Sequence, residues 1–294
     1  MNAVLICPSI CPAVAQLAIH TPLAAIPFLG ESLLEYWLTH LAMAGATNVR
    51  VLASDRPEHI AALIDNGARW GLKAEVVPEP RELTPVQAQI KYAGELVSSP
   101  FEVTLLDRFP GSSRPLFTCY VRLFAGILEW LPHALTPDRV GIRQLSPGVF
   151  VGLHSRIAQD AKILAPCWIG RNVFIGTGAT IGPMTVIEDR SFIERDAEVF
   201  GSVVGPDTFV GKAAVIREAI AWGNTLIHWK SDAFTEVTDA FLLSSLRRPA
   251  LASQSAGFVR RLGDIYSRNK EDLQTFWKHF LLNKDDKLST HDKL

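Results

Sequence analysis

The stretch that decides the fold runs from Val151 to Ile220 and reads, split at each recurring aliphatic residue, VGLHSR-IAQDAK-ILAPCW-IGRNVF-IGTGAT-IGPMTV-IEDRSF-IERDAE-VFGSV-VGPDTF-VGKAAV-IREAI. An isoleucine or valine stands at every sixth position, and the register slips by one residue at Val204. A small or β-branched residue follows four positions after each of them. A helix buries every third or fourth residue and a strand every second, so a period of six predicts a coil of short flat strands joined by tight corners.

Glycine comes directly after several of these aliphatic residues, where a corner needs a positive φ angle or a close backbone approach: Gly170, Gly176, Gly182, Gly205 and Gly211. The pattern is the hexapeptide β-helix signature. It resembles the left-handed parallel β-helix of bacterial hexapeptide-repeat transferases and of the C-terminal domains of sugar-phosphate nucleotidyltransferases. In those families three hexads close one triangular coil, so the resemblance implies about four coils here and a left-handed coil. The alternative, a sandwich of short strands, would show period two and irregular spacing.

Length and composition indicate an ordinary globular protein with room for a second domain beside the repeat, since the chain has 294 residues, 48% of them hydrophobic, and a net charge of -1. This charge gives no nucleic-acid footprint, so we expect no nucleic-acid partner. Proline interrupts the apolar N-terminal stretch, and no apolar run is long enough for a membrane span. The cysteines are scattered, which favours reduced thiols and a cytoplasmic location: Cys7, Cys11, Cys119 and Cys167.

Short apolar runs alternate with amphipathic segments in the first hundred residues. Strands are predicted near 3–7, 49–53, 74–77 and 101–106. Helices are predicted at 32–44, from Pro57 to a stop at Gly67, and at 84–96. Strand and helix in alternation predict a parallel sheet in a doubly wound fold.

A second resemblance is carried by the segment Pro22-Leu-Ala-Ala-Ile-Pro27-Phe-Leu-Gly30, followed by Leu33-Leu-Glu-Tyr36. It is similar to the run Pro-Lys-Pro-Leu-Leu-Pro-x-x-Gly and the Leu-Leu-Glu-Tyr helix of sugar-phosphate nucleotidyltransferases. Later segments, at 41–51, 69–72 and 78–80, keep the family's order and spacing. The resemblance therefore implies a truncated Rossmann-like doubly wound sheet, then a left-handed parallel β-helix, then a C-terminal helical tail.

The residues that carry chemistry in that family are replaced in this chain. Its phosphate-binding loop, Gly-x-Gly-Thr-Arg, supplies backbone N–H groups and an arginine, but here the loop reads Ser9-Ile-Cys-Pro-Ala13. The family's lysine falls at Leu23, and its later Gly-Thr-Ala falls at Thr84-Pro85-Val86. Asp107 alone matches a catalytic position, the aspartate that holds Mg²⁺. We therefore predict no catalytic residue, no cofactor unless the chain is active with Mg²⁺, and Asp107 as the one candidate metal ligand, the alternative being a turn residue.

Size favours the same interpretation, because only about forty residues separate Asp107 from the repeat. The family uses a much longer segment there to build the part of the sheet that holds the sugar phosphate. What remains, from Ser113 to Leu131, predicts one apolar helix. The expected units are thus 1–112, a degenerate nucleotidyltransferase-like domain; 113–147, a helical connector; 148–229, the β-helix; and 230–294, a cap, a linker and an amphipathic helix.

Two histidines, one in the repeat and one after it, raise an alternative function for the coil. Hexapeptide acyltransferases share the coil and use a histidine as general base with acyl-coenzyme A, for which the candidates are His154 and His228. The strict hexads leave no inserted loop to hold that cofactor, and a lone histidine can also be a solvated corner. Residues 221–229 are predicted to form a final strand that caps the coil.

The C-terminal helix, expected from about Phe258 to Leu282, carries an apolar stripe: Leu273, Phe276, Trp277, Phe280 and Leu281. We expect this stripe to pack either on the chain's own surface or on a partner. The partner would be a second copy of the chain or a pathway enzyme. The sequence thus favours a non-catalytic regulatory or scaffold member of a pathway that makes nucleotide sugars or surface polysaccharide. The alternatives are an active enzyme that transfers a nucleotide to a sugar 1-phosphate and an acyltransferase.

Overall fold

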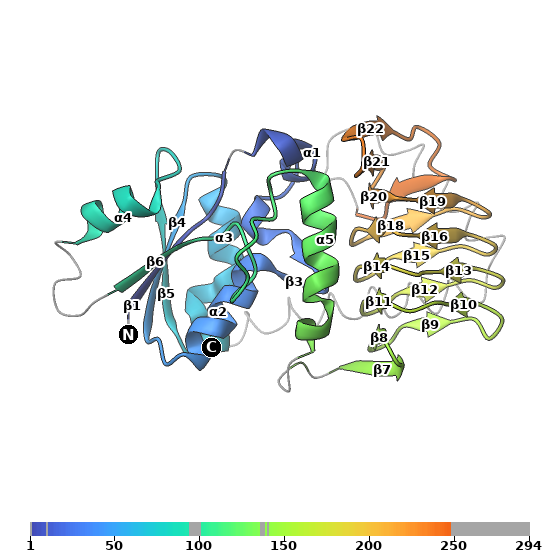
Figure 1. Cartoon of the computed structure of the whole chain (residues 1–294), viewed down its shortest axis with the longest axis horizontal. Helices are drawn as coiled ribbons and strands as arrows, with labels where there is room; N and C mark the ends of the chain where they lie inside the picture. The colour runs from blue at the N-terminus through green and yellow to red at the C-terminus, as the bar shows by residue number, and fades with distance from the viewer. Residues whose placement is uncertain (1, 10, 94–100, 136–138, 140, 248–294) are drawn as a thin grey trace, which may run out of the picture.

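The computed structural model describes residues 2–9, 11–93, 101–135, 139 and 141–247, and it places an α/β domain beside a stack of short strands (Figure 1). The expected C-terminal helix and the last residues of the expected 84–96 helix lie outside the described residues. Within the described part, no helix is both long and apolar enough to cross a bilayer.

The α/β domain is built on a four-stranded parallel sheet in the order β5-β4-β1-β6. The bounds of its strands are β1 Asn2–Ile6, β4 Asn48–Ala53, β5 Lys73–Pro78 and β6 Phe101–Leu105. Its α-helices are α1 Ala15–Ala18, α2 Leu33–Met43, α3 Pro57–Ile64 and α4 Pro85–Tyr92, with 3-10 turns η1 Pro12–Val14, η2 Leu23–Ala25 and η3 Asp65–Trp70. A two-stranded hairpin, β2 Pro27–Phe28 with β3 Glu31–Ser32, precedes α2.

Helices cover both faces of this sheet, as the sequence predicts. Leu5 and Val51 on one face share a core with residues of α2 and α3, such as Leu34 and Ile60. Val4, Ile6 and Leu52 on the other face pack with Ala88 and Tyr92 of α4. Because β1 is buried on both faces, it reads as a continuous apolar run from Ala3 to Ile6 rather than as an alternating one.

One helix in the connector is shorter than predicted. α5 spans Tyr120–Trp130 and continues into the 3-10 turn η4, Leu131–Ala134, so the predicted start at Ser113 is wrong. Leu116 and Phe117 are buried without being helical, and the Leu116 N–H donates to the Asp107 carbonyl at 2.7 Å. The apolar pattern therefore extends into a loop that is held by a tertiary hydrogen bond.

The repeat forms four coils of three short strands, and equivalent strands stack into three parallel sheets. The first coil contains β8 Val149–Gly152, β9 Arg156–Ile157 and β10 Lys162–Ile163, and the second contains β11 Cys167–Ile169, β12 Phe174–Ile175 and β13 Thr180–Ile181. The third coil contains β14 Thr185–Ile187, β15 Phe192–Ile193 and β16 Glu198–Phe200, and the fourth contains β17 Val203–Val204, β18 Thr208–Val210 and β19 Val215–Arg217. Ile163 pairs with Ile181, and Ile181 with Val199, so three hexads close one coil as predicted. Ile187 pairs with Val204, which is where the register slips by one residue. The hand of the coil stays a prediction from the resemblance.

Aliphatic side chains fill the inside of the coils. Ile175, Ile181, Ile187 and Ile193 are fully buried in one cluster, together with small residues such as Ala179 and Ala197. The strictness of the six-residue period follows from this packing, because each inward position has room for one side-chain size.

Antiparallel strands close both ends of the stack. β7 Ile142–Ser146 pairs with β8 at the first coil. β20 Ala219–Trp222, β21 Thr225–His228 and β22 Ala233–Glu236 follow the last coil and pair in this order. β23 Leu243–Ser245 pairs with β18. The prediction of a single final strand over 221–229 is therefore wrong. The chain turns back at Gly223, whose φ angle is 61°, and a hairpin results.

One outer face of the coil stack shares a core with the α/β domain. A row of apolar residues one rung apart belongs to the same cluster as α2 and the sheet: Phe150, Trp168, Val186, Val203 and Ile220. α5 lies between the two parts in Figure 1, and Phe124 of α5 stacks on Trp229 with ring centroids 4.4 Å apart. The two parts therefore pack through an apolar contact as well as being joined by the chain.

The register can be tested with two neighbouring positions of β13. Ile181 points into the coil and is fully buried, whereas Thr180 is half-buried on the outside between Lys162 and Glu198 of the adjacent rungs. We expect Ile181→Asp to cost several kcal/mol or to prevent folding, because an unpaired carboxylate would enter an apolar interior. Thr180→Asp should change the free energy of unfolding by about 0.5 kcal/mol or less. Equal losses in urea denaturation of the two variants would contradict the assigned register.

Candidate functional site

Ligands of open α/β sheets bind at the edge where the parallel strands end, and this edge is one candidate site in the chain. Four segments meet at this edge: the loop that follows β1 from Cys7, Asp55 after β4, Glu82 after β5, and Asp107 after β6. Glu82 and Asp55 both act electrostatically on Cys7, and Glu82 and Asp107 both act on Cys11. Three carboxyl groups therefore lie near the loop that follows β1.

The loop after β1 already binds an anion of its own chain. The backbone N–H and the hydroxyl of Ser9 both donate to the same Glu82 carboxylate oxygen, at 2.7 and 3.0 Å. Farther along the loop, Pro12 opens the turn η1 and has no N–H to donate. The Glu82 carboxylate thus occupies a backbone donor of the kind that a phosphate-binding loop offers to its ligand.

Two arginines at this edge, Arg56 and Arg108, are also engaged. Arg108 binds Asp107 through two hydrogen bonds of 2.7 and 3.1 Å. Arg56 binds Asp55 at 2.9 and 2.7 Å, and it donates to the Ala18 carbonyl at 2.6 Å. Each guanidinium therefore neutralises the carboxylate beside it and holds a loop, rather than pointing free charge into the crevice.

Asp107 lies where the sequence places it, at the end of β6, but its carboxylate is taken by Arg108. A Mg²⁺ ion there would have to displace the guanidinium, and in the described part of the chain no three His, Cys, Asp or Glu side chains gather as a metal site would need. The residues around Asp107 do not fit a preformed magnesium site, and its metal role stays a prediction. Leu23, at the family's lysine position, is fully buried in the core.

The cysteines at this edge are poorly suited to be nucleophiles. Burial raises the pKa of Cys7 to about 12, and the carboxylates of Glu82 and Asp55 act in the same direction. Burial also raises the pKa of Cys11, with Glu82 and Asp107 adding to it. Since the thiolate is the reactive form, these shifts lower the reactivity of both thiols.

The two candidate histidines do not meet. His154 lies at a corner of the first coil, where its φ angle is 61°, and His228 ends β21 beyond the last coil. Figure 1 shows β8 and β21 at opposite ends of the stack. Each is therefore a separate candidate for the single general base of an acyltransferase. The described coils pair rung on rung, with no inserted loop between them to hold a cofactor.

A second polar centre lies between the α/β domain and the coils, and the sequence alone did not reveal it. Glu188 is completely buried, and its two oxygens accept from the N–H groups of Leu29 and Gly30 at 2.6 and 2.9 Å. Leu29 and Gly30 form the two-residue turn of the β2–β3 hairpin, with φ angles of 55° and 80°. Two successive N–H groups in such a turn make a concave anion-binding nest.

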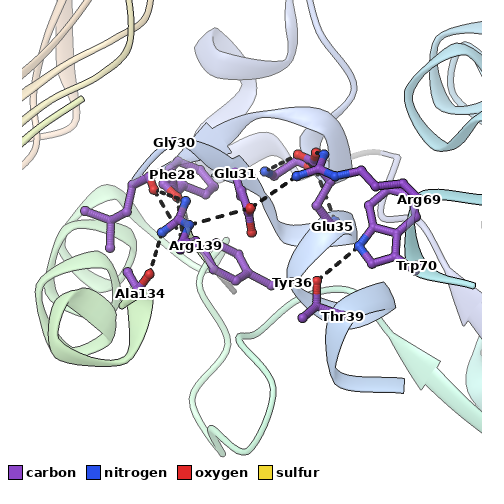
Figure 2. A network of polar contacts seen from close by, with 12 residues as sticks. Phe28, Gly30, Glu31, Glu35, Tyr36, Thr39, Arg69, Trp70, Ala134 and Arg139 are labelled. Atoms are coloured by element: carbon purple, nitrogen blue, oxygen red, sulfur yellow. Dashed lines mark hydrogen bonds and ion pairs between the residues drawn. The ribbon is translucent and has the colours of Figure 1, made fainter. Parts of the chain in front are cut away.

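Arg139 closes this centre from the connector. Its guanidinium lies over the rings of Tyr36 and Trp168, 5.4 and 5.2 Å from their centroids. It donates to the carbonyls of Ala134 and Leu29, and Glu31 lies 3.5 Å from its Nε. Figure 2 shows the continuation, in which Arg69 binds Glu35 and Glu31 at the start of α2. One connected network therefore joins the hairpin, α2, the connector and the coils.

One signal for this centre is present in the repeat. The residue after the inward aliphatic of the docked sheet is Gly152, Gly170 and Gly205 in three coils, but Glu188 in the remaining one. A single acid in a column of glycines is unusual for a corner. Its partner, the turn at Leu29, cannot be identified without the fold.

Comparisons with known proteins place the chain only coarsely, and no family model matches it. It is similar to two mutant forms of the perosamine N-acetyltransferase from Caulobacter crescentus in complex with CoA and GDP-perosamine. The sequence identities are 12% and 14% and the TM-scores 0.18 and 0.16, and each match covers 60% of this chain and 94% of the acetyltransferase chain. It is also similar to the acetyltransferase domain of PglB from Neisseria gonorrhoeae in complex with acetyl coenzyme A, with 12% identity, a TM-score of 0.17, and coverage of 61% and 98%. All three are named as acetyltransferases. TM-scores of this size assign no activity to the chain.

The Glu188 contact can be tested by removing the carboxylate. Glu188→Ala would leave the buried N–H groups of Leu29 and Gly30 without their acceptor, so we expect the free energy of unfolding to fall by about 1 to 3 kcal/mol for each group. Glu194 follows the next inward aliphatic and accepts from the Lys212 N–H at 2.9 Å near the surface. The control Glu194→Ala should cost about 1 kcal/mol or less. Similar losses for both variants would contradict the assignment.

The same carboxyl group predicts a pH dependence. Burial raises the pKa of Glu188 from 4.5 to about 8, with Asp189 adding to this and the two N–H groups and Arg139 opposing it. Between these values the folded chain holds a proton that the unfolded chain has released, so the contribution of Glu188 to stability falls as pH rises from about 4.5 to 8. Urea denaturation at pH 5.5, 7 and 8.5 should show a decline that Glu188→Ala removes. An unchanged decline in this variant would assign the pH dependence to other groups.

Proposed function

We propose that the protein is a non-catalytic member of the sugar-phosphate nucleotidyltransferase type, and that it acts in the cytoplasm as a regulatory or scaffold component of nucleotide-sugar or polysaccharide biosynthesis. The observation that carries this proposal is that the chain itself supplies the anion at the loop after β1. The Ser9 N–H and hydroxyl bind Glu82 instead of leaving a place for a phosphate.

Electrostatics support the same conclusion. A nucleoside triphosphate carries several negative charges and needs free backbone donors, a basic residue or a metal ion. Glu82 occupies the N–H and hydroxyl of Ser9, and the guanidinium groups of Arg56 and Arg108 are each bound to an aspartate. Binding a triphosphate would therefore break internal ion pairs and place the ligand beside three carboxyl groups.

Replacing the groups that bind and stabilise a phosphate lowers the rate of catalysis by a large factor. Removing one preorganised donor from a site that stabilises developing charge typically costs about 10² to 10³ in rate. This chain has Pro12, Ala13 and Leu23 at three positions where the family it resembles has such groups or their loop. The proposal therefore includes no turnover and no resident cofactor.

The part of the proposal that concerns partners rests on the sequence. The apolar stripe that contains Phe276, Trp277 and Phe280 would bind a pathway enzyme, with an aromatic residue as the main contact. Deleting the residues after Ser255 should then abolish binding to that enzyme and leave the melting temperature unchanged. A large drop in melting temperature would instead indicate packing on the chain's own surface.

The second candidate is an acyltransferase, because the structures similar to this chain are named as acetyltransferases in complex with CoA or acetyl coenzyme A. In its favour the chain has the coils and two histidines. Against it, the described coils pair rung on rung and extrude no loop to hold the cofactor. Acetyl coenzyme A is therefore the ligand that separates this candidate from the scaffold.

Complementation gives the decisive experiment. In a strain that lacks this protein, we expect the wild-type chain and the variants Asp107→Ala, His154→Ala and His228→Ala to restore the nucleotide-sugar pool equally. The reason is that none of these side chains performs chemistry in the proposal. Glu188→Ala, which disrupts the fold between the two parts, is the matched variant that should fail.

Assays in solution complete the test. With Mg²⁺, each nucleoside triphosphate and a panel of sugar 1-phosphates, we expect no pyrophosphate release, and with acetyl coenzyme A no thermal shift. A rate abolished by Asp107→Ala would establish the active nucleotidyltransferase. A shift with acetyl coenzyme A, lost in His154→Ala or His228→Ala, would establish the acyltransferase, and either result overturns the scaffold proposal.

A further inference from the structure

The strand β6 forms one edge of the four-stranded sheet, and none of the strands that the structure describes pairs with its outer side. On the inner side, the Leu106 N–H donates to the Ile6 carbonyl. Backbone groups alternate between the two sides of a parallel strand, so the N–H groups of Phe101, Val103 and Leu105 point outward. The edge offers a row of donors and acceptors to another strand.

The opposite edge of the sheet is protected, and β6 is not. β5 carries Lys73 and Glu75, and its Pro78 stands at an outward position, where a missing N–H blocks pairing. The sequence of β6 is FEVTL, with one exposed charge at Glu102 but no lysine, no proline and no bulge in its pairing with β1. Natural sheets usually blunt an edge that is meant to stay free, so an unprotected edge indicates a pairing site.

The side chains beside this edge are apolar and incompletely covered. Phe101, Val103 and Leu105 all project to the face of the sheet that α4 covers, and they are only half-buried against that core. α4 also leaves Val86 and Ile90 exposed, at 68% and 73%. Figure 1 shows α4 and the start of β6 at the end of the molecule remote from the coils, so the stack does not obstruct them.

From these observations we propose that β6 is a dimerisation strand, which pairs antiparallel with β6 of a second copy of this chain to form a continuous eight-stranded sheet. Val103 lies on the two-fold axis and faces Val103 of the second copy. Phe101 then faces Leu105, and Glu102 faces Thr104, so no like charges are opposed across the junction. The strand is complementary to itself, which is what a symmetric dimer requires.

The geometry of this pairing covers the half-buried face. A two-fold axis perpendicular to the sheet keeps each face on the same side, so both α4 helices lie on one face of the joined sheet and flank the axis. Phe101, Val103 and Leu105 of both copies meet between them. This arrangement removes from water the apolar surface that a single chain leaves half-exposed. The inference goes beyond the proposed function, because oligomeric state does not depend on whether the chain catalyses a reaction.

The test compares proline substitutions on the two edges. Val103→Pro removes an N–H that points outward from β6, and Val76→Pro removes an outward N–H from the blunted edge β5. By light scattering over a dilution series, we expect twice the chain mass for the wild type and for Val76→Pro, and the mass of one chain for Val103→Pro. Circular dichroism on the same samples checks that both variants are folded.

A cross-link keeps the proposal testable if the proline variants do not fold. Facing residues of a hydrogen-bonded antiparallel pair have Cα atoms about 5.5 Å apart, within the range that a disulfide spans. Val103→Cys treated with oxidised glutathione should give a covalent dimer, whereas the wild type and Val76→Cys should not. A monomeric wild type, a dimer unaffected by Val103→Pro, or no cross-link through Val103→Cys overturns the inference, including the case in which another protein occupies the edge.

Discussion

The contact of Glu188 with the turn at Leu29 and Gly30 is the interaction on which the arrangement of the two parts depends. The apolar row along the docked face supplies area but little register, because one apolar residue follows another at each rung. A shift by one coil would still bury apolar side chains. Only one coil, however, carries an acid in the glycine column, so the anion-binding turn can accept the stack in one register. The hydrogen bonds therefore provide specificity, and the apolar row provides most of the free energy.

This contact also shows what the segment from Pro27 to Gly30 does in the fold. The N–H groups of Leu29 and Gly30 bind the Glu188 carboxyl group of the same chain. The loop after β1 does the same through Ser9 and Glu82. At two places, then, backbone donors of a kind that can bind phosphate are used to hold the fold together. A motif read from sequence identifies such donors, and only the fold shows what they bind.

The sequence predicted what depends on local packing and missed what depends on distant partners. The six-residue period and the slip at Val204 could be read because each inward position is limited by its own coil. The alternation of strands and helices was equally local. The start of α5 was misplaced, because Leu116 is buried by a loop rather than by a helix. Arg139 gave no signal at all, since its carbonyl and aromatic partners come from segments far away in the sequence.

The short segment between β6 and the coils connects the chemistry and the assembly of this protein. The described sheet ends at β6, and the connector supplies α5 and Arg139, which pack the domain against the coils. Because the described connector packs on the coils and adds no strand to the sheet, β6 has no outer neighbour in the described chain. We infer that the docking of the coils and the open edge of the sheet have one structural cause.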